Sequence, residues 1–186
     1  MNNVARRGLG LLILPVVGII ALILAPKSWF YKDRRPTRLG RAVNRAWTWM
    51  AGAGLTPASW PGQPRGGTVA IEVRGRRSGR PHANVITWVE HEGNRYFVSM
   101  LGDHVDWVRN VRAAGGRAAI RHGNLQPVRL VELPADQRAP VIQAYLKRTR
   151  MATQEHLSGL DPDAPVEEFA RIADRHPVFR IESGGK

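Results

Sequence analysis

Alternating apolar residues separated by short turns constrain the fold of this chain more than any other feature. In the first such segment, Val69, Ile71 and Val73 fall on one face of an extended strand. Two more segments follow after turns that are too short to hold a crossover helix, so the strands must run antiparallel. The three predicted strands cover residues 68–74, 84–90 and 95–101.

The rest of this region continues the pattern and adds helices. Gly123 and Asn124 form a turn between two further strands, and Asp103 suits the N-cap of a helix. Five or six short antiparallel strands with a few helices predict an α+β protein, mainly β, built as a small barrel with flanking helices. The added strands are predicted at 117–122, 128–133 and 178–181, and the helices at 103–114, 134–149 and 165–174.

The N-terminal part contains a long apolar run. Residues 8–26 include no charged or polar side chain. As a helix, the run would span about 28 Å at ~1.5 Å per residue, close to the ~30 Å hydrocarbon core of a membrane. We predict an uncleaved transmembrane anchor; the alternative is a cleaved signal peptide, with Arg6 and Arg7 as its basic n-region and the apolar run as its hydrophobic core. Because more Lys and Arg residues follow the run than precede it, the rest of the chain is predicted to lie on the cytoplasmic side.

A second helix is predicted between the anchor and the strands, over residues 37–53. Its apolar residues recur at helical spacing, with basic residues between them. Such a helix could lie on the membrane or cover the core of the barrel, and we favour the second because most amphipathic stripes are buried. A linker rich in Pro and Gly follows at 57–67. The stripe consists of Leu39, Val43, Trp47 and Met50.

The formal net charge of +13 is distributed in a way that argues against nucleic-acid binding. Residues 1–66 hold ten of the 28 Lys and Arg residues but only one of the 15 Asp and Glu residues. The excess charge therefore precedes the predicted barrel, whereas a nucleic-acid-binding domain carries it on its folded surface.

Several kinds of catalytic chemistry are absent from the sequence. The chain has no Cys, which excludes disulfides, thiolate zinc sites, iron–sulfur clusters and cysteine nucleophiles. Its six His residues are scattered without metal-ligand spacing, so no metal site is predicted. The chain has no G-x-S-x-G motif, and Ser78 has no recognisable base partner.

The turn at 75–81 is the strongest candidate for binding. Four arginines fall within residues 74–80, together with two glycines and no acidic residue. Arginine forks bind phosphate or carboxylate groups in a bidentate way, and successive turn N–H groups can surround an anion. The alternative is a solvated basic hairpin without a ligand.

The predicted helix at 103–114 carries a second, weaker candidate. Trp107 could pack against a flat heterocycle, and Asn110 could hydrogen-bond that ring or cap the neighbouring chain. A tryptophan at helical spacing is more often part of the core. Tyr145, on a later helix, could face a pocket, but core packing is favoured there as well.

Four segments resemble the family of deazaflavin-dependent nitroreductases and quinone reductases, which use coenzyme F-420. They cover residues 73–89, 95–123, 138–148 and 176–181. The resemblance implies a split β-barrel related to FMN-binding barrels, with coenzyme F-420 favoured over FMN. It implies that the basic turn holds the anionic part of the coenzyme. The residues that it places in the coenzyme site are Arg76, Arg77, Ser78, Gly79, Arg80, Trp107 and Asn110.

The resemblance also implies an enzyme, a membrane-anchored oxidoreductase that transfers a hydride from the reduced coenzyme to a nitro or quinone-like acceptor. Ser99 would border the ring, and Ser99 or Tyr145 could supply a proton. The alternative is a non-catalytic, membrane-tethered binding module for a lipid, a flavin or another anionic small molecule. Pairing into a homodimer and contact of the basic flank with membrane lipids are further expectations.

Together these interpretations predict a single-pass protein of the cell membrane. Its chain is divided into three parts. Residues 1–30 form the anchor, residues 31–66 form the amphipathic helix and the linker, and residues 67–186 form the barrel that binds the deazaflavin.

Overall fold

The computed structural model describes residues 31–32, 35–56, 66–149 and 159–184. The anchor predicted at 8–26 and most of the predicted linker lie outside these ranges. Within them, every helix is too short or too polar to cross a membrane. The chain divides into two compact units, Met1–Val43 and Asn44–Lys186.

The described part of the first unit is small. Strands β1 (Tyr31–Lys32) and β2 (Arg35–Pro36) pair in antiparallel fashion. Helix α3 (Arg38–Gly52) begins in this unit and continues into the second. Thr37 caps its start, because the Thr37 side-chain oxygen accepts a hydrogen bond of 3.0 Å from the amide of Gly40.

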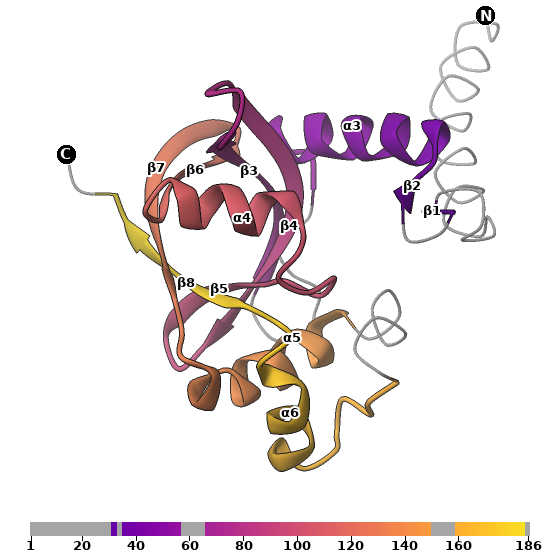
Figure 1. The fold of residues 1–186 in the computed structure, drawn as a ribbon, viewed down its shortest axis with the longest axis vertical. Helices are drawn as coiled ribbons and strands as arrows, with labels where there is room; N and C mark the ends of the chain where they lie inside the picture. Colours follow the sequence, from indigo (N-terminus) through magenta and orange to yellow (C-terminus); the bar gives the residue numbers. More distant parts are fainter. Residues whose placement is uncertain (1–30, 33–34, 57–65, 150–158, 185–186) are drawn as a thin grey trace, which may run out of the picture. The chain divides into compact units, whose positions relative to one another are not determined.

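The second unit is an antiparallel barrel that closes in the strand order β3-β4-β5-β8-β7-β6, which confirms the predicted α+β barrel with helices (Figure 1). Closure rests on the pairing of β3 with β6, in which Ile71 lies opposite Ile120. The strands are β3 (Gly66–Arg74), β4 (Pro81–His91), β5 (Asn94–Val98), β6 (Arg117–His122), β7 (Asn124–Glu132) and β8 (Val178–Ser183). The helices are α4 (Asp106–Ala113), η1 (Ala135–Gln137), α5 (Ala139–Thr149) and α6 (Val166–Ala173).

Two hydrophobic clusters form the core, one on each side of the barrel wall. Phe97 and Phe179 are buried inside the barrel, where Val108 and Val111 of α4 pack against them. Outside the barrel, α5 and α6 cover the other face of β4, β5 and β8, with Phe169 fully buried. Because alternate residues of a strand point to opposite faces, β4, β5 and β8 each supply both clusters from a single alternating sequence.

Several element boundaries differ from those predicted. Helix α4 begins at Asp106 with Val105 at its N-cap, so the prediction that Asp103 caps it is wrong. Strand β7 begins at Asn124, because its polar first residues pair with β6 through their backbone and show no apolar alternation. Gly66 and Gly67 belong to β3 and not to the linker. The helix predicted at 134–149 is divided into η1 and α5, and β5 ends at Val98.

The C-terminal turn of helix α3 is more deeply buried than the predicted apolar stripe. Leu39 is 45% exposed, and the other three stripe residues are partly exposed. Ala51 and Gly52 are buried instead. The absence of a side chain at Gly52 matters, because a Cβ there would lie 3.1 Å from the Cδ atom of Arg121. Sequence periodicity alone missed this contact, since it is made by small residues.

Candidate functional site: a basic turn beside a groove

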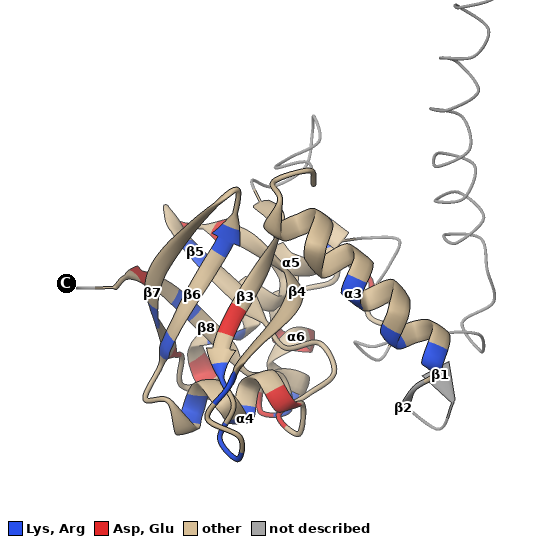
Figure 2. Ribbon diagram, turned by 90° about the horizontal axis from the view of Figure 1, so that it is seen from above, with Lys and Arg blue, Asp and Glu red and all other residues tan. Residues whose placement is uncertain are grey.

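The basic turn, residues 75–80, joins β3 to β4 and lies next to α4, as the blue loop in Figure 2 shows. The amide of Gly75 donates to the carbonyl of Arg80 at 2.8 Å, and the amide of Gly79 donates to the carbonyl of Gly75 at 2.8 Å. Gly79 has a φ of +65°, and a Cβ there would meet no atom within 4 Å. The turn is therefore closed by its own backbone but open to solvent beside Gly79.

Arg76 and Asn110 hold this turn against α4. The Asn110 side-chain oxygen accepts hydrogen bonds from the backbone amide of Arg76 at 3.2 Å and from its guanidinium at 2.9 Å. The guanidinium also donates to Asp106 at 2.9 Å. Asn110 is buried, with 5% of its surface exposed. Of the two contacts considered for Asn110, the structure shows the one that caps a neighbouring segment of chain.

Arg77 and Arg80 are the cations of the turn that remain available. Both are exposed, and neither forms an ion pair with any residue that the structure describes. Among the described residues, the only carboxylate bonded to the turn is that of Asp106, which contacts Arg76. Two guanidinium groups beside an open backbone turn are a donor set for phosphate or carboxylate groups.

Ser78 has a histidine neighbour that the sequence analysis did not recognise. The Ser78 hydroxyl lies 3.0 Å from the Nε2 atom of His82 and accepts a hydrogen bond of 3.3 Å from the amide of Arg80. His82 follows the turn on β4, so only the folded hairpin shows the proximity of its ring to Ser78. The hydroxyl stabilises the turn and is exposed beside the two free arginines.

The remaining predicted site residues contact other parts of the structure. The ring of Trp107 packs edge-on against Phe179 at 5.4 Å between centroids, inside the barrel. Ser99 is buried, and its hydroxyl donates to the carbonyl of Gly102 at 2.6 Å. Tyr145 is buried among the residues of α5 and α6, where burial raises the pKa of its hydroxyl above the ordinary value. Their roles in catalysis and coenzyme binding stay predictions.

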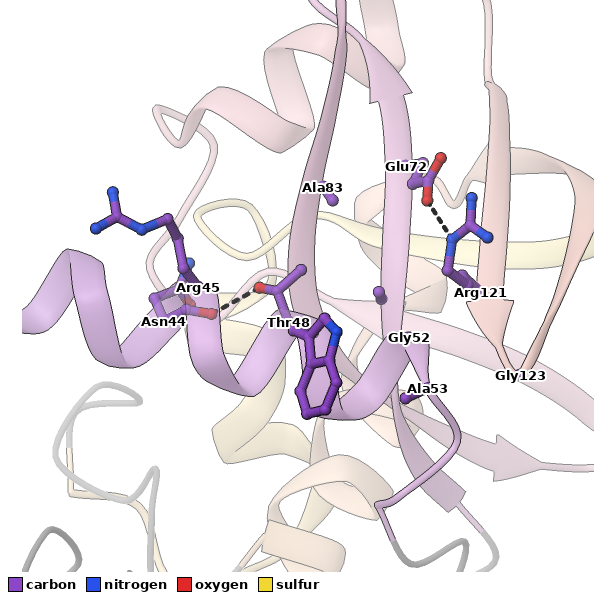
Figure 3. Close-up of a pocket in the computed structure, with 11 residues that line it drawn as sticks. Asn44, Arg45, Thr48, Gly52, Ala53, Glu72, Ala83, Arg121 and Gly123 are labelled. Carbon is purple, nitrogen blue, oxygen red and sulfur yellow. Dashed lines mark hydrogen bonds and ion pairs between the residues drawn. The ribbon is translucent and has the colours of Figure 1, made fainter.

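A groove of about 580 Å³ lies on the outer face of β3 and β4. Figure 3 shows it between α3 and the ion pair of Glu72 with Arg121, whose atoms are 2.6 Å apart. The hydrogen bond that the Arg121 guanidinium donates to the Glu72 carboxylate raises the pKa of Arg121, which stays charged. The lining residues are Asn44, Arg45, Thr48, Trp49, Gly52, Ala53, Ala70, Glu72, Ala83, Arg121 and Gly123.

Three hydrogen bonds attach the end of α3 and the residues after it to the barrel, and so fix one wall of the groove. The amide of Gly123 donates to the carbonyl of Gly52 at 2.8 Å. The Nε2 atom of His122 lies 3.2 Å from the carbonyl of Thr56, and the Thr56 hydroxyl donates to the carbonyl of Thr68 at 2.5 Å. The sequence analysis assigned no site residue in this groove, because its floor and walls are formed largely by small residues from distant segments.

The groove and the basic turn lie on one face of one hairpin. Ala70, Glu72 and Arg74 alternate along β3, so their side chains share the outer face. Glu72 pairs with Ala83, and Arg74 pairs with Pro81 at the start of the turn. Two residues of strand span about 7 Å, so a single elongated ligand could contact both the groove and the turn.

The described residues form a closed antiparallel barrel with a cationic turn beside an outer groove, and such a turn has the donor groups that suit an anion. A family model described as F420H(2)-dependent quinone reductase matches residues 43–166. The match covers more than half of the chain, and the chain belongs to this family of oxidoreductases. The predicted family, enzyme class and coenzyme are confirmed at the level of the family.

Solved structures provide weaker similarities, and no curated protein matches the sequence. An F420-H2 dependent reductase is 20% identical over 62% of this chain and 93% of that chain, with a TM-score of 0.44. A domain-swapped dimer is 17% identical over 77% and 96%, with a TM-score of 0.46. A conserved hypothetical protein from Mycobacterium tuberculosis is 15% identical over 63% and 73%, with a TM-score of 0.40. Family membership rests on the family model, and pairing of two copies stays a prediction.

The described residues fit the coenzyme that the family uses. Coenzyme F-420, as the family resemblance implies, has a planar ring system, a phosphate and an oligoglutamate tail. Arg77 and Arg80 supply uncompensated positive charge for the anionic part, and the open space beside Gly79 leaves room for it. The groove volume of about 580 Å³ falls within the range of about 300–1,000 Å³ that is usual for small-molecule sites.

We predict that Asn110 matters more for stability than Asp106, although both contact Arg76. Asn110→Ala leaves the Arg76 amide without its acceptor and should lower the free energy of unfolding by about 1–3 kcal/mol. Asp106→Ala removes an ion pair whose carboxylate side chain is 82% exposed and should cost less than about 1 kcal/mol. Urea unfolding of both variants measures the difference, and equal losses would contradict the assigned role of Asn110.

His176 should make the fold sensitive to acid. Burial lowers the pKa of His176 below its ordinary value of 6.5, while its Nδ1 atom lies 3.0 Å from the carbonyl of Ser99. His176 therefore binds a proton more readily in the unfolded chain than in the folded one. The stability contributed by burying the neutral ring is fully present above pH 6.5, and it is lost as the pH falls below that value. His176→Asn keeps a hydrogen-bond donor but cannot titrate.

We expect the free energy of unfolding of the natural chain to fall more than that of His176→Asn between about pH 7.5 and about pH 5. Urea unfolding at both pH values measures this difference, and the remaining histidines cancel because both proteins contain them. Parallel pH dependences would show that burial of His176 has no such effect.

Proposed function

We propose that this chain transfers a hydride from reduced coenzyme F-420 to a quinone-like or nitro acceptor. The observation that carries the proposal is the position of two unpaired arginines, Arg77 and Arg80, on the same hairpin as the groove. The proposal extends the family assignment to this chain's own residues and to a class of acceptor. The coenzyme, when bound, supplies the hydride chemistry, and the protein binds and orients it.

The residues of the site would divide this work between the turn and the groove. Arg77 and Arg80 would bind the phosphate and the tail, while Arg76 holds the turn in place through Asn110. On the groove floor, Ala70 and Ala83 have small side chains that allow a flat ring to approach the sheet. Trp49 adds an aromatic surface to the wall, which suits a planar ring.

The Glu72–Arg121 pair would orient the polar edge of a ring. It provides a charged donor and a charged acceptor, 2.6 Å apart, on the side of the groove that faces α3 (Figure 3). The hydroxyls of Ser99 and Tyr145 do not line the groove. Water that enters the groove would therefore supply the proton that the acceptor takes up.

The decisive variant removes the two free charges of the turn. We expect Arg77→Gln combined with Arg80→Gln to weaken binding of the coenzyme about 100-fold, because each charged hydrogen bond contributes about 1.5 kcal/mol and 1.4 kcal/mol corresponds to tenfold. Titration of the full-length chain with oxidised and reduced coenzyme, followed by tryptophan fluorescence, measures the dissociation constant. Absorbance assays that follow oxidation of the reduced coenzyme by 2-methyl-1,4-naphthoquinone measure turnover.

A matched control changes the same charge elsewhere. Arg171→Gln combined with Arg175→Gln alters two exposed arginines at the end of α6 and should leave coenzyme binding unchanged. If both double variants weakened coenzyme binding equally, the loss would come from the lower net charge of the protein, and the proposed coenzyme site at the turn would be refuted. Binding of the coenzyme without any oxidation of it by quinone or nitro acceptors would favour the non-catalytic binding module.

We further propose that the chain is anchored in the cell membrane through residues 8–26, with the barrel on the cytoplasmic side. The support is the apolar run and the basic residues that follow it. A membrane-soluble quinone would then reach the site from the bilayer, and the basic flank would contact anionic lipid headgroups.

The proposed anchor leads to two predictions that can be measured on the full chain in cells. The protein should stay in the membrane pellet after carbonate extraction, because an apolar helix is not removed by high pH or salt. A C-terminal tag should resist protease added outside spheroplasts and be cleaved after lysis. Release by carbonate would contradict the anchor, and cleavage in intact spheroplasts would contradict the orientation.

A further inference from the structure

The barrel has a second cavity, separate from the groove, at one of its ends. Its volume is about 220 Å³. Gly67 and Val69 of β3 contribute to it, as do residues of the five other strands. The full set of lining residues is Gly67, Val69, Trp88, Arg95, Ile120, His122, Asn124, Gln126 and Ile181.

Alternation along the strands shows that this cavity is the inner mouth of the barrel. Val69, Ile120 and Ile181 belong to the cluster that fills the barrel interior. The cavity is therefore closed at its base by the core, to which Val108 and Val111 of α4 also belong. It is a dead-end cavity with an apolar base.

The rim of the mouth is polar and carries one positive charge. The Arg95 guanidinium lies 5.8 Å from the centre of the Trp88 ring, a cation–π contact. Arg95 forms no ion pair within the part of the chain that the structure describes, although Glu90 lies opposite it in the strand register. No carboxylate is among the lining residues.

The other rim groups can form hydrogen bonds. The Nε2 atom of His122 lies 3.2 Å from the carbonyl of Thr56, and because a carbonyl only accepts, Nε2 carries the proton. The side chains of Asn124 and Gln126 are exposed at the start of β7 and provide amide donors and acceptors. The mouth thus combines the Arg95 cation, further hydrogen-bonding groups and an apolar base.

We propose that this cavity binds a small organic monocarboxylate with an apolar or aromatic body. The carboxylate would contact Arg95, and the body would lie against Trp88 and the apolar base formed by Val69 and Ile120. An unpaired guanidinium above an apolar, dead-end cavity matches this amphipathic chemistry, since the charge is recognised at the rim and the apolar surface is removed from water below it.

The proposed site is distinct from the coenzyme groove, although both use the same two strands. Val69 and Ile120 point into the mouth, whereas their neighbours Ala70 and Arg121 line the groove on the outside. Ala70 pairs with Arg121 in the strand register. A ligand in the mouth would therefore lie behind the groove, on the inner side of the same β-ladder, and would not occupy it.

Benzoate is a suitable probe because it joins a carboxylate to a flat apolar ring. We expect the full-length chain to bind benzoate with a dissociation constant of about 0.1–1 mM, as is usual for a ligand of this size. Isothermal titration calorimetry and ligand-observed NMR measure the binding. Benzamide, which has the same shape without the charge, should bind at least about tenfold more weakly.

Two variants test the location, and one variant controls for charge. Arg95→Gln should weaken benzoate binding at least about tenfold, and Gln126→Trp should block the mouth from its exposed rim without altering the core. As the charge control, Arg129→Gln removes an exposed positive charge from β7, the strand that also carries Gln126. This variant should bind benzoate as the natural chain does. Unchanged binding in Arg95→Gln or in Gln126→Trp, or no binding to the natural chain at about 10 mM benzoate, would overturn the proposal.

The two proposals can fail separately. Binding of coenzyme F-420 should be unchanged in Arg95→Gln, and binding of benzoate should be unchanged in the Arg77→Gln, Arg80→Gln double variant. Competition between benzoate and the coenzyme at one site would show that the probe occupies the groove, and it would overturn the proposed second site while leaving the coenzyme site intact.

Discussion

The pairing of β3 with β6 is the constraint on which the rest of the barrel depends. Without it the two strands would be open sheet edges with unpaired backbone groups. The same ladder directs Ile71 and Ile120 inward and Ala70 and Arg121 outward. A single backbone register therefore produces both the apolar interior and the floor of the outer groove. A shift of one residue would exchange the two faces and lose both.

The basic turn depends on this interior through α4. Val108 and Val111 anchor the helix to the barrel core, and Asn110 between them binds Arg76. The turn is thereby fixed by one arginine, which leaves Arg77 and Arg80 exposed to solvent. Because the positions of these two charges are set by a buried amide, they are better organised for an anion than charges on a flexible loop would be.

The sequence predicted what is encoded locally and missed what arises from distant contacts. Alternation at Val69, Ile71 and Val73 predicted the hairpins, and the density of arginine predicted the turn. The groove was missed because Gly52, Ala70 and Ala83 carry no local signal and become a surface only when α3 lies against the barrel. Likewise, the polar start of β7 concealed a strand that forms through backbone pairing with β6.

The exposed apolar residues near the groove bear on what the protein acts upon. Trp49, which lines the groove, is 68% exposed, and Leu55, just after α3, is 61% exposed. Apolar surface that stays in water costs about 25 cal/mol per Å² relative to burial, so its placement beside a site favours an occupant that covers it. A charged turn at one end of the hairpin and apolar surface beside the groove suit a charged coenzyme and an apolar acceptor. The separation of the charged surface from the apolar surface supports a quinone-like acceptor in the proposed function.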